Sequence, residues 1–159
     1  MAKLNVGDRA PDFTLASESG ETVSLARALE RGPVVLIFYP MDNTPGCTAQ
    51  LCAARDDAAA YAAAGASVYG VNNGSARSHA AFKAKHGLAA PLLVDARLVV
   101  ASAYDSVLGF GLLKFVNRTV VGIVPDGTIA FYERGTPATG EILDSLSSRG
   151  VAAKPATRR

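Results

Sequence analysis

One uninterrupted apolar segment, Val34–Tyr39, constrains the fold more than any other part of the chain. Its residues, Val-Val-Leu-Ile-Phe-Tyr, are all aliphatic or aromatic. A strand with one face in water shows alternating polar residues, whereas a continuous apolar run of this length is typical of a strand covered on both faces. Pro40 ends the run, because proline has no N–H to donate to a sheet. We therefore expect a central strand between two layers of other elements.

Segments of strand and helix character alternate along the rest of the chain, and Asp126-Gly127 is a strong hairpin-turn signal near its end. The order predicts one domain, residues 1–150, with residues 151–159 as a flexible tail. Its fold class is α/β, a three-layer thioredoxin-like arrangement with a mixed central sheet, helices on both faces and an N-terminal β-hairpin. Besides Val34–Tyr39, the expected elements are a hairpin at Phe13–Leu25, strands at Ser67–Val71, Leu92–Val94, Val116–Val124 and Thr128–Glu133, and helices at Leu25–Glu30, Pro45–Ala64, Ser75–His86, Arg97–Tyr104 and Gly140–Arg149.

Charge and hydropathy exclude several function classes. The net charge is +2, from 16 basic and 14 acidic side chains, which gives no case for a nucleic-acid or membrane-surface partner. No run approaches the roughly 20 apolar residues that cross a bilayer. The first residues lack the apolar core of a signal peptide, so we expect a cytoplasmic location. In that reducing compartment, two cysteines are more often catalytic, metal-binding or simply buried than permanently joined.

Cys47 lies where a helix is expected to start directly after the central strand. Thr44 followed by Pro45 fits an N-cap with proline at the first helical position. Unpaired backbone N–H groups and the positive end of the helix dipole favour an anion in the first turn, and therefore the thiolate over the thiol. Gly46 leaves the sulfur approachable, and the Thr44 hydroxyl is within reach of it.

The second cysteine, Cys52, follows five positions later. Five residues of α-helix correspond to about 7.5 Å of rise and about 500° of rotation. The two Cα atoms would then lie roughly 8–9 Å apart, beyond the roughly 7 Å that a disulfide spans. A bond between Cys47 and Cys52 therefore requires at least one helical turn to unwind, and the proline and glycine before Cys47 make the start of the helix the easiest part to melt.

Alternative interpretations of the cysteines are weaker. Two buried cysteines without chemistry would not account for the Thr-Pro-Gly-Cys helix start. No metal is expected, because His79 and His86 are distant in sequence from the two cysteines and do not form the usual local ligand pairs with them. They fit surface positions of a helix better. A thioredoxin-type redox motif needs Cys-x-x-Cys, which is absent.

The pattern Pro40-x-x-x-Thr44-x-x-Cys47 resembles the active-site signature of the peroxiredoxins. With Cys52 five positions later, it is similar to the Q-type subgroup, also called bacterioferritin comigratory protein. The resemblance extends over nearly the whole chain, through segments that are individually weak and jointly persuasive: Val6–Phe13, Ser78–Leu88, Arg118-Thr119 and Ile123–Gly127.

The resemblance implies a peroxidase that uses no cofactor. Cys47 would be the peroxidatic residue, whose thiolate reduces hydrogen peroxide or an organic hydroperoxide and becomes a sulfenic acid, and Cys52 would be the resolving one. Thr44 would hydrogen-bond the peroxide and Pro40 would shield the sulfenic acid from water. Arg118 would hold the thiolate charged. Thioredoxin or a similar dithiol would reduce the disulfide, and an intramolecular resolving cysteine makes a monomer the expected state.

The context of Arg118 supports this role independently, because strand alternation places it on one sheet face with Val116, Val120 and Val124, an unusual setting for an unpaired charge.

Two departures from the subgroup are Gln50, where relatives commonly carry glutamate, and Ala53-Ala54, where an aromatic is common. A thiol–disulfide carrier that never meets peroxide, or a scaffold with incidental cysteines, are the competing hypotheses.

Overall fold

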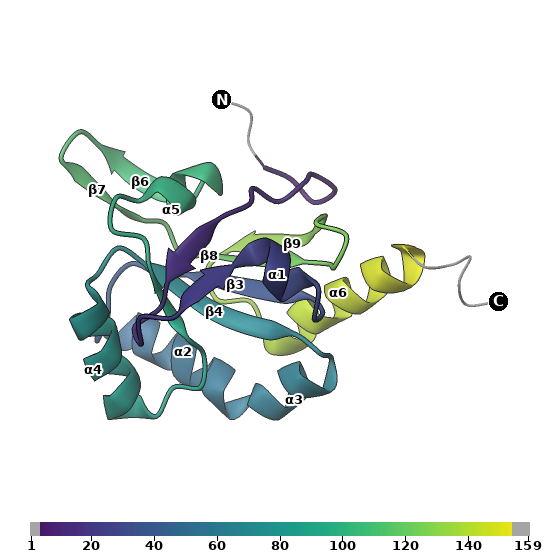
Figure 1. The fold of residues 1–159 in the computed structure, drawn as a ribbon, viewed down its shortest axis with the longest axis horizontal. Helices are drawn as coiled ribbons and strands as arrows, with labels where there is room; N and C mark the ends of the chain where they lie inside the picture. The colour runs from purple at the N-terminus through teal and green to yellow at the C-terminus, as the bar shows by residue number, and fades with distance from the viewer. Residues whose placement is uncertain (1–3, 154–159) are drawn as a thin grey trace.

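The computed structural model describes residues 4–153 and has the predicted three-layer α/β architecture (Figure 1). Its core is a five-stranded mixed sheet in the order β5-β4-β3-β8-β9, in which β3, β4 and β5 run parallel to one another and β8 is antiparallel to both of its neighbours, β3 and β9. The sheet strands are β3 (Val34–Phe38), β4 (Ser67–Asn72), β5 (Leu92–Val94), β8 (Thr119–Ile123) and β9 (Ile129–Arg134). The predicted central strand is confirmed, since every residue of β3 is buried between its neighbours β4 and β8.

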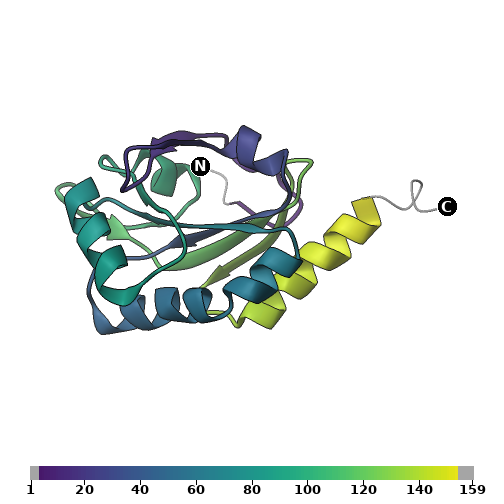
Figure 2. The same ribbon diagram turned by 60° about the horizontal axis from the view of Figure 1, so that its bottom comes forward.

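Helices cover both faces of this sheet (Figure 2). One face carries the buried side chains of α2, α3, α4 and α6, and the other those of α1 and α5 together with Phe13 beside the N-terminal hairpin. The predicted hairpin is confirmed, with Thr14 opposite Ser24. The elements are β1 (Thr14–Ala16), β2 (Thr22–Ser24), α1 (Leu25–Leu29), α2 (Pro45–Asp56), α3 (Ala58–Ala63), α4 (Ala76–His86), α5 (Val99–Ala103) and α6 (Thr139–Ala153).

Two predicted helix boundaries were wrong. The single helix expected over Pro45–Ala64 is divided at Asp57, whose backbone leaves helical geometry at φ −96° and ψ 16°. The carboxylate of Asp57 accepts a hydrogen bond of 2.6 Å from Thr139 at the start of α6. The last helix was expected to stop at Gly150, but α6 continues to Ala153. Of the predicted tail, residues 154–159 lie outside the described part of the chain.

The segment before the last two sheet strands also differs from the prediction. A single strand over Val116–Val124 was wrong, because the chain turns at residues 117–118 between β7 (Leu113–Val116) and β8. Strand β7 pairs with β6 (Val107–Phe110) in a separate hairpin that the sequence did not indicate. This hairpin projects from the body of the molecule (Figure 1) and exposes Phe110, Leu112 and Leu113. Within residues 4–153, no helix is both long and apolar enough to span a bilayer.

Candidate active site

Cys47 lies in the first turn of α2, just beyond the carboxyl end of β3. Thr44 is the N-cap residue and Pro45 the first helical residue, as predicted. The side chain of Cys47 is fully buried, in an apolar cluster that includes Ile37, Tyr39 and Leu51. Its thiol is free. The backbone therefore presents the positive end of a 12-residue helix to a sulfur that is shielded from bulk water.

Arg118 is brought directly to this sulfur. Its Nη2 donates a hydrogen bond of 3.3 Å to the Sγ of Cys47. The guanidinium also passes so close to Gly46 that a Cβ atom there would lie 3.2 Å from Nη2, which explains the need for a small residue beside the cysteine. A positive charge at this distance stabilises a thiolate, whereas a neutral thiol gains little from it.

The fold places Arg118 differently from the sequence argument. Thr119, the first residue of β8, is paired with Phe38, the last residue of β3. Arg118 therefore lies beside the carboxyl end of β3, from which the chain continues into α2. The prediction that Arg118 shares a face with Val116 was wrong, because the turn before β8 sends Val116 to the opposite side of the sheet, while Val120 packs in the cluster that contains Cys47.

Gln50 fixes the orientation of Arg118. Its Oε1 accepts a hydrogen bond of 2.7 Å from Nη1 of Arg118, while its Nε2 donates to the carbonyl of Gly135 at 3.3 Å. The N–H of Gly135 in turn donates to the carbonyl of Arg118 at 3.0 Å. Because Gln50 is neutral, it orients the guanidinium without cancelling its charge. Both polar atoms of the Gln50 amide are thus hydrogen-bonded.

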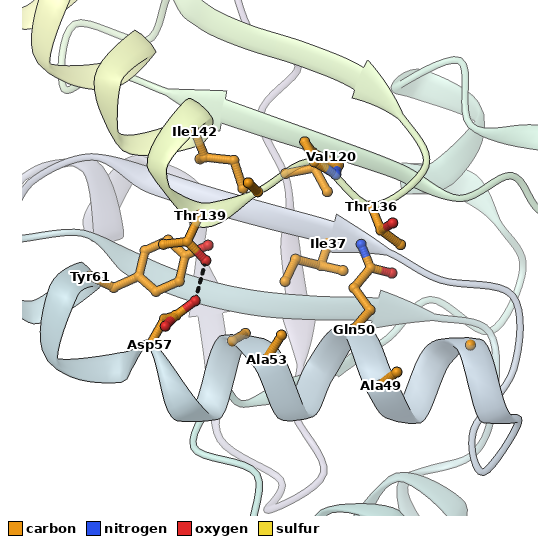
Figure 3. A pocket seen from close by; sticks show the side chains of 14 residues that line it. Ile37, Ala49, Gln50, Ala53, Asp57, Tyr61, Val120, Thr136, Thr139 and Ile142 are labelled. Carbon is orange, nitrogen blue, oxygen red and sulfur yellow. Dashed lines mark hydrogen bonds between the residues drawn. The ribbon is translucent and has the colours of Figure 1, made fainter.

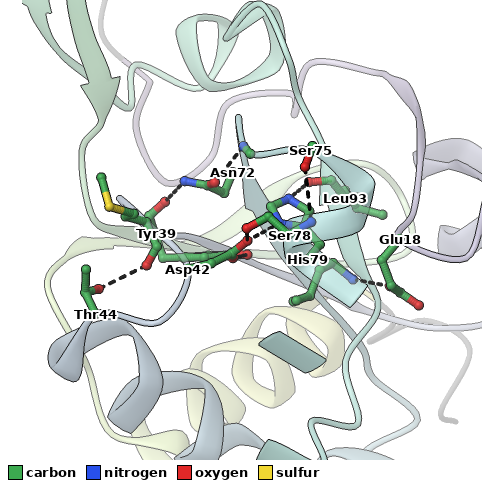
Figure 4. Close-up of polar contacts among 12 residues, drawn as sticks. Glu18, Tyr39, Asp42, Thr44, Asn72, Ser75, Ser78, His79 and Leu93 are labelled. Carbon is green, nitrogen blue, oxygen red and sulfur yellow. Dashed lines mark hydrogen bonds and ion pairs between the residues drawn. The ribbon is translucent and has the colours of Figure 1, made fainter. Parts of the chain in front are cut away.

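The two remaining predicted residues flank the site. The hydroxyl of Thr44 donates to the carbonyl of Met41 at 3.0 Å (Figure 4) and accepts no capping hydrogen bond from the N–H groups of α2, which leaves its oxygen lone pairs available as acceptors. Pro40 directly follows Tyr39 at the end of the central strand, and the carbonyl of Pro40 accepts a hydrogen bond of 2.7 Å from Asn72. Both side chains are partly exposed.

Cys52 lies further along the same unbroken helix and is partly buried against the cluster that contains Cys47. Both thiols are free. With helical rise and rotation maintained from Pro45 to Asp56, the Cα atoms of the two cysteines stay roughly 8–9 Å apart. The structure therefore corresponds to the reduced state, in which no disulfide joins them.

A cavity of about 520 Å³ runs beside α2 (Figure 3). Gly46 lines it near the cysteine, and Tyr61 lines it toward α3. Its walls are mostly apolar and include Ile37 and Val120 from the sheet. Ala49, Gln50 and Ala53 also line it, so the cavity borders the helical turns that separate Cys47 from Cys52.

A buried polar network behind the active-site loop was not predicted. His79, expected on the surface of its helix, is fully buried, so that expectation was wrong; His86 is partly exposed. Nδ1 of His79 lies 2.7 Å from Oδ2 of Asp42, and Nε2 lies 3.2 Å from the carbonyl of Leu93 (Figure 4). The one available signal was spacing, because His79 lies three residues before Phe82 and so on the same helix face.

Asp42 collects hydrogen bonds from several directions. Tyr39 donates its phenol to Oδ1 at 2.7 Å, and the Ser78 hydroxyl donates to Oδ2 at 2.7 Å. Burial on its own raises the pKa of Asp42, but the hydrogen bonds from His79, Tyr39 and Ser78 outweigh it and hold the pKa below the usual range. Burial and the bond to Asp42 raise the pKa of Tyr39 far above its ordinary value, so the phenol stays a donor.

Residues 6–132 match the AhpC/TSA family. The chain belongs to that family. A relative from Triticum aestivum, peroxiredoxin Q, chloroplastic, is 48% identical over 93 residues, which are 58% of this chain and 42% of the relative. The chain thus spans less than half the length of that relative. A putative peroxiredoxin of Mycobacterium tuberculosis H37Rv is 35% identical over 147 residues, covering 88% of this chain and 91% of the relative.

Solved structures of the family have the same fold. Peroxidoxin BcpB from Mycobacterium tuberculosis superposes with a TM-score of 0.83 at 33% identity, over 90% of this chain and 96% of that one. The bacterioferritin comigratory protein of Xanthomonas campestris gives 0.77 at 27% identity, over 87% and 92%. The resemblance to Q-type peroxiredoxins and the thioredoxin-like fold class predicted from the sequence are thereby confirmed.

The lowered pKa of Asp42 makes a pH-dependent contribution to stability. This contribution is complete at pH values above 3.8, the ordinary pKa of the carboxyl group. It is lost as the pH falls through the lower pKa that Asp42 has in the folded state. We expect the difference in free energy of unfolding between the wild type and Asp42→Asn to shrink as the pH falls below 3.8. Urea unfolding across this pH range measures it. Asp144→Asn, at an exposed position, is the charge-loss control, and a pH-independent difference for Asp42→Asn would contradict the prediction.

Proposed function

We propose that the protein is a thiol-dependent peroxidase that reduces hydrogen peroxide and organic hydroperoxides and serves antioxidant defence. The observation that carries this proposal is the hydrogen bond of 3.3 Å from the Arg118 guanidinium to the sulfur of Cys47 at the start of α2. A helix N-terminus and a cation aimed at one sulfur stabilise the thiolate, which is the nucleophile in peroxide reduction. The family supports the same chemistry.

In the first step, the thiolate of Cys47 attacks one peroxide oxygen. The S–O bond forms as the O–O bond breaks, and the departing oxygen takes a proton and leaves as water or an alcohol. Arg118 stabilises the negative charge that moves from sulfur to the leaving oxygen. The hydroxyl oxygen of Thr44 accepts a hydrogen bond from the O–H group of the peroxide. Pro40 shields from water the sulfenic acid that remains on Cys47.

In the second step, Cys52 resolves the sulfenic acid. Its thiolate attacks the sulfur of Cys47, the S–S bond forms as the S–O bond breaks, and the sulfenic oxygen takes up a proton and leaves as water. The turns of α2 between the cysteines must unwind for the two sulfurs to meet. Thioredoxin or a similar dithiol then reduces the disulfide by thiol–disulfide exchange and is itself oxidised.

The cavity beside α2 supports organic hydroperoxides as substrates. It is lined by Gly46 next to Cys47, and its largely apolar walls are suited to a carbon chain. The related bacterioferritin comigratory protein of Xanthomonas campestris has alkyl peroxide reduction activity. We propose in addition that the protein acts as a monomer, since Cys52 is on the same helix as Cys47, and that it works in the cytoplasm.

Replacement of each cysteine separates the peroxidase from the competing functions. We expect Cys47→Ser to abolish turnover and Cys52→Ser to give one stoichiometric oxidation with poor recycling, because only Cys47 meets peroxide. Peroxide consumption with a thioredoxin system measures both. Full recycling by Cys47→Ser would contradict the assignment of Cys47 as the peroxidatic residue. Unaltered turnover in both variants would favour a scaffold with incidental cysteines.

Arg118→Met removes the cation and both donors while keeping an unbranched side chain. Loss of a preorganised donor of this kind costs about 10²- to 10³-fold in rate, and we expect a reduction of this size in the rate constant for oxidation of Cys47 by hydrogen peroxide. Arg27→Met, at an exposed position of α1 on the other face of the sheet, is the matched control. A rate in Arg118→Met equal to that of the control would show that the thiolate does not depend on this guanidinium, as expected for a thiol–disulfide carrier.

A further inference from the structure

The loop that joins β3 to α2, residues 40–44, decides where Cys47 lies, yet its own backbone is not self-supporting. Asn43 adopts a left-handed conformation at φ +64°, which an L-residue rarely adopts. Met41 is 61% exposed and so contributes little packing. A loop with a strained backbone and an exposed apolar residue must be held by other parts of the fold. Asp42 is the buried residue of this loop.

Asp42 connects the loop to α4. Oδ2 faces both Ser78 and His79 of that helix at 2.7 Å, and Oδ1 receives the phenol of Tyr39, which packs in the same buried cluster as Cys47. The side chain of Asp42 is only 4% exposed and that of His79 is fully buried. A carboxylate in such a setting requires partners, because burial without them is costly.

His79 is itself fixed from the other side. Its Nε2 lies 3.2 Å from the carbonyl of Leu93, the middle residue of β5. A carbonyl only accepts, so Nε2 carries a hydrogen; when the ring is protonated, Nδ1 donates to Asp42 at the same time and the contact becomes a buried ion pair. Asn72 of β4 adds two bonds of 2.7 Å to the carbonyls of Tyr39 and Pro40.

We propose that Asp42 and His79 are a positioning pair that sets the reactivity of Cys47 toward peroxide. The inference rests on the proposed peroxidase function and adds to it two residues that touch neither the sulfur nor the peroxide. They act through the loop: Asp42 is two residues before the N-cap Thr44, whose hydroxyl is bonded to the carbonyl of Met41 inside the same loop.

The physical consequence concerns the contact between Cys47 and Arg118. These two residues come from different elements, α2 and the turn before β8, and their 3.3 Å bond exists only while the start of α2 is held in place. A displacement of about 1 Å at a reacting group costs up to about 100-fold in rate. Loss of the bond between His79 and Asp42 leaves Ser78 in contact with Oδ2 but weakens the hold of α4 on the loop, so that the loop shifts by such amounts without unfolding the domain.

Two conservative replacements of His79 test the pair. The amide nitrogen of asparagine takes the place of Nδ1, so His79→Asn keeps a donor to Asp42. The amide nitrogen of glutamine takes the place of Nε2, so His79→Gln keeps the donor to Leu93 and leaves Oδ2 without its partner from the ring. In the Cys52→Ser background, we expect His79→Gln to slow oxidation of Cys47 by hydrogen peroxide by about tenfold or more, and His79→Asn to stay within about threefold of the parent.

Leu29→Ala, in the core on the other face of the sheet, controls for lost stability, and all rates are measured where circular dichroism shows each variant folded. A slow Leu29→Ala variant, or equal rates in the two His79 variants, would overturn the inference and leave the peroxidase intact. A parent that does not react with peroxide, by contrast, would overturn the proposed function and with it this inference.

Discussion

Helical geometry and disulfide geometry are incompatible for the two sulfurs of this chain. Cys47 and Cys52 share the unbroken helix α2, which keeps their Cα atoms roughly 8–9 Å apart. The fold must therefore satisfy two opposed demands. A rigid helix start is needed to present a thiolate, whereas a helix that opens is needed to join the sulfurs.

In the reduced structure, contacts with other elements hold α2 along its length. Its beginning is held by Arg118 at the sulfur of Cys47 and by Asp42 in the preceding loop. The sequence had suggested the same end as the easiest to melt, because Pro45 and Gly46 are poor helix formers. Around Cys52 the helix is anchored as well, since Leu51 and Ala54 are buried and Nη1 of Arg55 donates to the carbonyl of His86. Opening the turns between the two cysteines therefore requires contacts of α2 with the rest of the fold to break.

Local signals in the sequence predicted the central strand and the helix start at Thr44, and the resemblance to the peroxiredoxins implied the pairing of Arg118 with Cys47. They failed where a residue's environment is decided by distant segments. His79 is buried because Asp42, 37 positions earlier, and Leu93, 14 positions later, supply acceptors on both sides of its ring. The hairpin β6–β7 was missed because its Gly-Phe-Gly-Leu-Leu segment lacks the alternation of polar and apolar residues that indicates a strand. Its apolar side chains are exposed in the structure, although apolar residues usually indicate burial.

Backbone hydrogen exchange in the reduced and the peroxide-oxidised protein tests the central claim, that α2 opens to form the disulfide. Reduced protein should show protected amides from Thr48 to Asp56, because these lie inside an intact helix. Once mass spectrometry confirms a complete Cys47–Cys52 bond, protection in this segment should be lost while β3 and β4 keep theirs. Equal protection of α2 in both states would contradict the account.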